Sequence, residues 1–197
     1  MLSATRPAGQ PDAEPTVRTQ VWTGTAVAAD DGWRVDQLTV GIDDCLPPEL
    51  NEQLLAAYRD WHEAQARWSE PPDPEHPLLE QTMVDPGLSD ARDLLLEDQQ
   101  EGVAWRYPHD PANAVVTDLG IGQARVIDCH EAHPDYGAFD LETGERREDL
   151  SPAPEQGQMN RVVVDLERVA GGDWKVNGWR SERDSTCTPG ETSYAVP

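Results

Sequence analysis

The sequence predicts an α+β fold in which helices are followed by antiparallel strands and cover one face of a bent sheet. The helical patterns lie between residues 48 and 101, and the alternating strand patterns lie between 103 and 182. Helices and strands that are segregated along the chain in this way are typical of α+β domains. A third observation, a hairpin pattern that occurs twice, adds a β-hairpin ahead of the helices.

The first helix is predicted from Pro48 to Trp68. Proline suits the first turn of a helix, where its missing N–H costs no hydrogen bond. Apolar residues recur along the segment at spacings of three and four: Leu50, Leu54, Ala57, Tyr58, Trp61, Ala64 and Trp68. Such a stripe is typical of a helix face that packs on a core. The segment therefore predicts one long helix lying on the sheet.

A short helical turn at 76–79 and a second long helix at 88–101 follow. Asp85-Pro86-Gly87 closes the short turn. Ser89 is the expected N-cap of the second helix, and Gly102 is its expected C-cap.

Seven strand segments are predicted after the helices, at 103–107, 114–119, 121–130, 136–140, 145–148, 159–169 and 174–182. Leu141-Glu142-Thr143-Gly144 is expected to join 136–140 to 145–148 as a hairpin. In 159–169, apolar Val162, Val164 and Leu166 alternate with charged residues, as in a half-buried strand.

The repeated pattern occupies 27–45 and 169–187. Each copy has a turn rich in Gly and Asp, a Trp followed by a basic residue and Val, a strand, and then Cys45 or Cys187. Both copies predict β-hairpins. Duplication and coincidence remain open as explanations. The predicted organisation is a disordered tail at 1–16, an extra hairpin at 17–45, one α+β domain at 46–187, and a C-terminal tail at 188–197.

The composition excludes some classes of partner. The formal net charge is −23 over 197 residues. Such a chain repels phosphate, so nucleic acid and anionic membranes are not expected partners. No apolar run approaches the roughly 20 residues that span a bilayer. No signal peptide is visible, so the chain is either cytoplasmic or has lost a leader.

The three cysteines, Cys45, Cys129 and Cys187, do not have the spacing of a zinc motif. One disulfide is favoured, and this would place the protein in an oxidising compartment, extracellular or in the cell envelope. The alternative is three buried thiols in a cytoplasmic protein.

Between Pro48 and Cys187 the chain resembles the nuclear-transport-factor-two-like, or SnoaL-like, superfamily, in particular its small secreted or lipid-anchored actinobacterial members. The resemblance rests on LLAAYRDWHEA, ARDLLLEDQQEGV, ARVIDCHE, FDLETGE and VVVDLERVAGGDWKV followed by STC. It implies a cone-shaped, curved antiparallel sheet. It also implies a disulfide between Cys129 and Cys187, which leaves Cys45 free or intermolecular.

The resemblance further implies where an enzyme of this type would carry its acid–base groups, namely Tyr58, His62, Asp128 and His130. A buried Asp–His pair can remove a proton next to a carbonyl. Asp128 and His130 lie two residues apart on one strand, so both face the same side. We expect that side to be solvent, because charged residues follow His130, and we expect His62 to be exposed as well. No catalytic residue is therefore assigned.

Metal and nucleophile chemistry are not supported by the cluster at 128–135. A strand directs Cys129 and His130 to opposite faces, and Pro134 prevents a helix that would align His130 with His133. No metal site and no cofactor are expected. If the cone encloses a ligand pocket, its expected lining is Tyr58, Trp61, Trp174 and Trp179.

These observations favour a non-catalytic secreted or envelope-associated binding module whose partner is a protein or a small molecule. Two alternatives stay open, a SnoaL-like enzyme (isomerase, cyclase or hydrolase) and an accessory domain of a larger assembly. A homodimer through the sheet is a further possibility.

Overall fold

The computed structural model describes residues 46–108, 110–120, 122–183 and 187, together with the backbone of 21–29 and 32–41. The predicted tails at 1–16 and 188–197, and Cys45, lie outside these residues. The helices are α1 (Pro48–Trp68), α2 (Pro77–Thr82) and α3 (Gly87–Glu101), with a 3-10 turn at Pro111–Asn113. The strands are β1 (Val21–Ala29), β2 (Gly32–Gly41), β3 (Val103–Arg106), β4 (Val115–Leu119), β5 (Gln123–Glu131), β6 (Gly137–Asp140), β7 (Met159–Arg168) and β8 (Trp174–Arg183).

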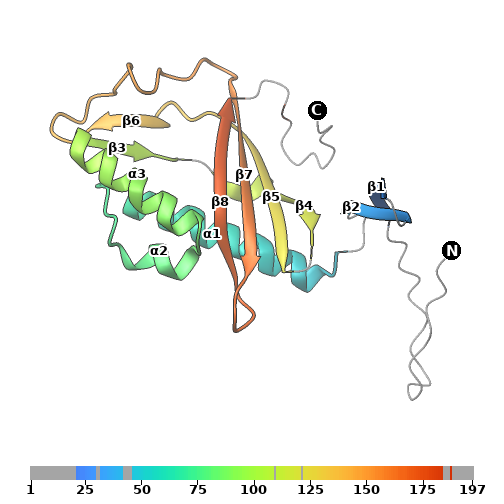
Figure 1. The fold of residues 1–197 in the computed structure, drawn as a ribbon. Coiled ribbons are helices and arrows are strands. Elements are labelled where there is room, and N and C mark those ends of the chain that lie inside the picture. Colours follow the sequence, from blue (N-terminus) through green and yellow to red (C-terminus); the bar gives the residue numbers. More distant parts are fainter. Residues whose placement is uncertain are drawn as a thin grey trace.

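The α+β prediction is confirmed, with three helices ahead of antiparallel sheets. Strands β4, β5, β7 and β8 pair in that order, and β2 of the β1–β2 hairpin joins β4 through the single pair Gly41–Asp118. The second sheet contains only β3 and β6. Figure 1 shows α1 crossing the β5–β7–β8 strands, while α2 and α3 lie beside β8.

The helix boundaries follow the predicted ones closely. α1 begins with Pro48 and ends at Trp68 as expected. Gly102 takes the left-handed conformation (φ 68°) and closes α3, because glycine has no Cβ to clash there. The N-cap prediction is wrong. Pro86 occupies that position, and the Ser89 hydroxyl instead donates to the Asp85 carboxylate at 2.6 Å.

The predicted hairpin between 136–140 and 145–148 is confirmed only near its turn, where the Asp140 N–H donates to the Glu145 carbonyl at 2.8 Å and the Arg147 N–H donates to the Ala138 carbonyl at 2.9 Å. β6 pairs with β3 along its whole length, and only an isolated Phe139–Arg146 bridge joins it to the following segment. The Arg146 guanidinium also donates to the carbonyls of Tyr136 (2.8 Å) and Pro134, which ties this segment to the residues before β6.

Two faces of the main sheet are set by strand alternation. In β5 the even-numbered positions face the helices, and their partners in β7 continue the same face. This face joins the helices in one apolar core, which includes Trp61 of α1 with its ring 6.0 Å from that of Trp179 on β8. Odd-numbered positions lie on the opposite face, where Ile127 and Val163 are buried beside the disulfide.

The Cys129–Cys187 disulfide is confirmed, with the two Cα atoms 5.9 Å apart. It ties Cys187, four positions beyond the end of β8, to the interior strand β5, across a sequence separation of 58. A disulfide of this kind forms and persists in an oxidising compartment.

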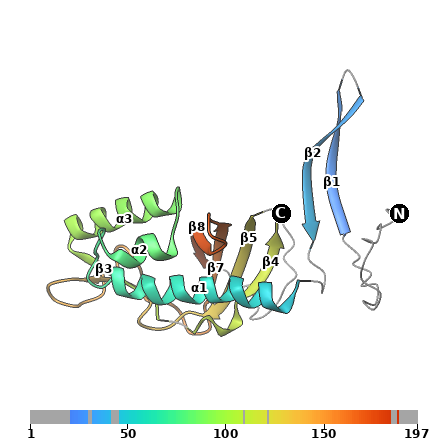
Figure 2. The same cartoon turned by 90° about the horizontal axis from the view of Figure 1, so that it is seen from below.

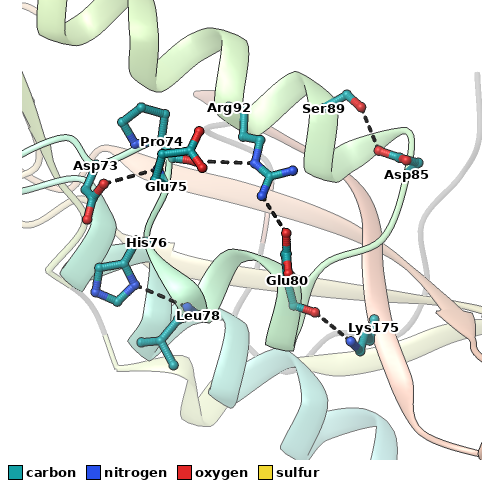
Figure 3. Close-up of polar contacts among 10 residues, drawn as sticks. All are labelled: Asp73, Pro74, Glu75, His76, Leu78, Glu80, Asp85, Ser89, Arg92 and Lys175. Atoms are coloured by element: carbon teal, nitrogen blue, oxygen red, sulfur yellow. Dashed lines mark hydrogen bonds and ion pairs between the residues drawn. The ribbon is translucent and has the colours of Figure 1, made fainter.

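Polar contacts fix α2 and α3 against β8 (Figure 3). Arg92 of α3 donates to Glu80 of α2 at 2.7 Å and to the carbonyl of Pro74 at 3.3 Å. Lys175 of β8 donates to the Glu80 carbonyl at 2.6 Å, near the C-terminal end of α2, where carbonyls lack helical partners. The backbone of Gly87 lies so close to β8 that a Cβ there would be 2.6 Å from the Asn177 carbonyl carbon.

The two hairpins that share a sequence pattern also share a register. In β1–β2 the pairing shifts between Ala26–Val35 and Thr25–Gln37, which leaves Asp36 as a bulge. In β7–β8 it shifts at the equivalent step, between Leu166–Val176 and Asp165–Gly178. Each bulge thus lies three residues after the shared Trp. The likeness between the two segments therefore extends from sequence to backbone pairing.

Candidate functional site

The buried polar group of the domain lies between α1 and the sheet. The Tyr58 hydroxyl donates to Asp128 Oδ2 at 2.8 Å. Both residues have a relative exposure of 0%. Tyr58 is placed there by the apolar stripe of α1, and Asp128 by the alternation of β5. The pair therefore joins the long helix to an interior strand across 70 residues of sequence.

His130 and Asn160 extend this polar group along the inner face of the sheet. They are register partners on β5 and β7, and their exposures are 5% and 2%. His130 Nδ1 lies 3.9 Å from Asp128 Oδ2, which is beyond hydrogen-bond distance. At this distance the two side chains form an ion pair only when the imidazole is protonated.

The expectation that Asp128 and His130 face solvent is wrong. β5 continues to Glu131, which pairs with Met159, so His130 lies within the sheet rather than at its end. Both side chains point to the covered face.

The expected exposure of His62 is wrong as well, since it is only 8% exposed. His62 follows Tyr58 by four residues and so shares its helix face, and the two ring centroids lie 6.3 Å apart. Three of the four acid–base candidates that the resemblance implies, His62, Asp128 and His130, were thus expected to be exposed but are buried.

The Tyr58 phenol has a pKa raised well above its ordinary value. Burial is the main cause, and the negative charge of Asp128 and the hydrogen bond to it add to the effect. The phenol therefore stays protonated and acts as a donor. A phenol of this kind holds a carboxylate in place but does not supply a base.

The tryptophans expected to line a pocket fill space instead. Trp61 is 1% exposed, and Trp179 packs against the same core. Trp174 also packs on this core but pairs with Arg168 at the turn end of β8, whereas Asp128 pairs with Val162 toward the other end. Trp174 is therefore not brought together with Tyr58.

A groove of about 330 Å³ lies on the outer side of α1, between it and α2. Its walls include Asp60, Glu63 and Arg67 of α1 and Leu78 and Gln81 of α2. This concavity is separate from the Tyr58–Asp128 pair, which has no exposed surface.

Asp98 is a buried carboxylate that sequence reasoning missed. It is 6% exposed and accepts a hydrogen bond from the Trp105 indole at 3.1 Å. Burial raises its pKa to about 6, against the lowering effect of that hydrogen bond, and the charges of Glu101 and Glu97 raise it further. Its position three residues after buried Leu95 was the available signal, because that spacing returns to the core face.

The described residues hold neither a metal-binding cluster nor a helix suited to span a membrane. Within these ranges no three His, Cys, Asp or Glu side chains converge as a metal site. Among the helices in the same part of the chain, none is long and apolar enough to cross a membrane.

Comparison with known proteins gives a likeness of fold alone. No protein-family model matches the chain, and no curated protein matches it. Among solved structures, it is similar to the crystal structure of the intermembrane space region of chloroplast protein ARC6. The TM-score is 0.48 at 13% sequence identity, covering 68% of this chain and 97% of the other. A likeness at this level assigns neither a family nor a function.

Proposed function

We propose that this chain is a non-catalytic interaction module of the cone-shaped, nuclear-transport-factor-two-like type, working outside the cell or in the cell envelope. The observation that carries the proposal is the closed Tyr58–Asp128 pair. Both members are fully buried, and the Tyr58 hydroxyl donates to Asp128 Oδ2 at 2.8 Å. A group without exposed surface cannot touch a substrate, whereas it can hold a helix on a sheet.

The compartment follows from the disulfide. Cys129 and Cys187 fasten the chain just after its last strand to the interior strand β5. Disulfides of this structural kind are rare in reducing cytoplasm and common in secreted and envelope proteins. The helices-then-strands order and the pairing β4–β5–β7–β8 support the proposed fold type.

A specific observation keeps the SnoaL-like enzyme as a second candidate. Tyr58, Asp128 and His130 lie close together on the covered face, and this is the set that an acid–base site would need. Opening of the domain would have to expose them before chemistry could occur. The two functions therefore differ in what the Tyr58 hydroxyl does.

Replacement of Tyr58 by Phe distinguishes the interaction module from the enzyme. A hydrogen bond to a charged group contributes about 1.5–3 kcal/mol, so a structural Tyr58 predicts a loss of that size in the free energy of unfolding. The matched control is Tyr136→Phe, whose hydroxyl shares an exposed 3.1 Å contact with Ser181 and should cost less than about 0.5 kcal/mol.

The same variant is assayed with small carbonyl compounds and polyketide-like ligands. Turnover by the wild-type chain that disappears in Tyr58→Phe, with the unfolding free energy unchanged, would contradict the proposal and establish the enzyme.

A further inference from the structure

The solvent face of α3 carries an unusual stripe of acidic residues. Asp90, Asp93, Glu97 and Glu101 recur at spacings of three and four, so they lie along one side of the helix. All four are exposed, and no ion pair among the described residues includes them. We call this set the α3 stripe.

Two exposed leucines border the α3 stripe. Leu94 is 39% exposed and lies one turn from both Asp90 and Glu97. Leu96 is 43% exposed and lies one turn from Asp93, on the other side of the stripe. The helix therefore presents apolar side chains on both borders of a negative strip. Among the described residues only Leu141 and Leu150 are comparably exposed large apolar residues.

The charges of the α3 stripe destabilise the helix that carries them. Asp93, Glu97 and Glu101 follow one another at i, i+4 and i+8, and like charges at this spacing destabilise a helix. Glu101 lies in the last turn, where the helix dipole disfavours negative charge, and that turn has no basic residue. The one basic residue of α3, Arg92, lies on the other flank and is already paired with Glu80. The fold compensates the stripe only at its ends: the helix dipole favours Asp90 in the first turn, and Glu101 is attracted electrostatically by Arg147, which is already paired with Asp149.

The surroundings of the stripe are acidic too. Residues 48–101 contain fourteen Asp and Glu and three Arg. All three arginines are paired with glutamates of the same helical layer: Arg59 with Glu52, Arg67 with Glu63, and Arg92 with Glu80. Figure 2 shows α3 at the margin of this layer, with α2 between it and α1. Within the part of the chain that is described, no other helix covers its outer side.

From this we infer that the α3 stripe is the docking surface for a basic amphipathic segment of a partner protein. Lysines or arginines would meet the four carboxylates, and apolar residues beside them would cover Leu94 and Leu96. The inference rests on the proposed function as an interaction module and names the chemistry of its partner.

Two other occupants fit the stripe poorly. A second copy of this chain would bring four carboxylates against four carboxylates, within chains of net charge −23. A single metal ion needs oxygens that converge within about 2.6 Å of it. Positions 90 and 101 are eleven residues apart and lie about 16 Å apart along the axis, so their carboxylates cannot converge on one ion.

The test is a binding titration with the full chain. The probe is a fluorescent peptide of about 15 residues that, as a helix, has lysines on one face and leucines on its borders. A scrambled peptide of the same composition is the reference. The stripe variant carries Asp90→Asn, Asp93→Asn, Glu97→Gln and Glu101→Gln. The matched control variant removes four exposed charges elsewhere, by Glu142→Gln, Glu145→Gln, Glu155→Gln and Asp173→Asn.

We expect the wild-type chain to bind the patterned peptide more tightly than the scrambled one, with affinity falling as salt rises. The dissociation constant should rise at least about tenfold in the stripe variant and less than about threefold in the control variant. Without any peptide, the melting temperature of the stripe variant should exceed that of the control variant, because like-charge repulsion has been removed.

Several results would overturn the inference. They are equal binding of the two peptides, equal weakening in the two variants, or a stripe variant less stable than the control. Calcium binding that the stripe variant loses would assign the face to a cation instead. None of these outcomes depends on Tyr58→Phe, so the stripe can fail while the proposed function stands, and the reverse also holds.

Discussion

Replacement of Asp98 by Asn should stabilise the protein at neutral pH, even though it changes a buried residue. Asp98 is 6% exposed, and its pKa is raised to about 6 from an ordinary value of 3.8. An acid with a raised pKa binds its proton more tightly in the folded state. The contribution of Asp98 to stability is therefore greatest below about pH 4, falls as the pH rises from about 4 to 6, and stays lower above that.

The size of the effect follows from the pKa difference. A shift of about two pKa units corresponds to roughly 3 kcal/mol of lost stability at pH 7. Asparagine removes this cost, and its amide oxygen can still accept from the Trp105 indole. We therefore expect Asp98→Asn to raise the free energy of unfolding at pH 7.5 by about 2–3 kcal/mol.

The assay is urea denaturation of wild type and variant at pH 5 and pH 7.5. Lower pH is avoided because the chain has a pI near 4.3 and would lose its charge. The difference between variant and wild type should grow by about 1 kcal/mol between the two pH values. Glu155→Gln removes an exposed charge that does not act on Asp98 and serves as the control, with a small difference that hardly changes with pH. A variant that is less stable than wild type at pH 7.5, or a gain that does not grow with pH, would refute this reasoning.

Three further predictions concern the contacts that fix the helices and the disulfide. Gly87→Ala should lower the free energy of unfolding by about 2–4 kcal/mol, because the new Cβ would lie 2.6 Å from the Asn177 carbonyl carbon. The control Ser89→Ala, on the exposed side of α3, should cost far less. Equal melting temperatures of the two variants would contradict the close approach of α3 to β8. The double variant Cys129→Ala, Cys187→Ala should lower the free energy of unfolding by about 2–4 kcal/mol, since it frees a 58-residue loop. In the wild-type protein, mass spectrometry without reductant should find the disulfide between these two cysteines rather than at Cys45. If the Lys175 ammonium on the Glu80 carbonyl stabilises the end of α2, Lys175→Met should lower the free energy of unfolding by about 0.5–1 kcal/mol, and Lys175→Arg should lower it less. Identical denaturation curves for wild type and Lys175→Met would show that it does not.

The helices could be predicted well from the sequence because their signals are local. The stripe from Leu50 to Trp68 and the proline at Pro48 define α1, and Gly102 defines the end of α3. The strands of the main sheet were also accessible, because Val162, Val164 and Leu166 recur at every second position in 159–169 and charged residues occupy several of the positions that alternate with them.

The pairing of β6 was not accessible from local signals. It depends on β3, more than 30 residues earlier. Contacts of this range do not leave a pattern in a single sequence.

The candidate site shows the same limit. Alternation placed Asp128 and His130 on one face correctly, but it could not tell which face was covered. The charged residues after His130 suggested a strand end, whereas pairing with β7 continues through Glu131. Burial of a polar residue depends on its partner, and for Asp128 that partner, Tyr58, lies 70 residues away.

The most direct test of the central claim is whether the Tyr58 hydroxyl is shielded from water. Proton NMR in water should show a separate, slowly exchanging hydroxyl resonance that disappears in Tyr58→Phe, because a fully buried hydroxyl bonded to Asp128 at 2.8 Å exchanges only when the structure opens. That result would support an interior that serves the fold and leaves binding to the surface. A Tyr58 hydroxyl that exchanges at the rate of an exposed tyrosine, while the protein remains folded, would contradict it and indicate an open site.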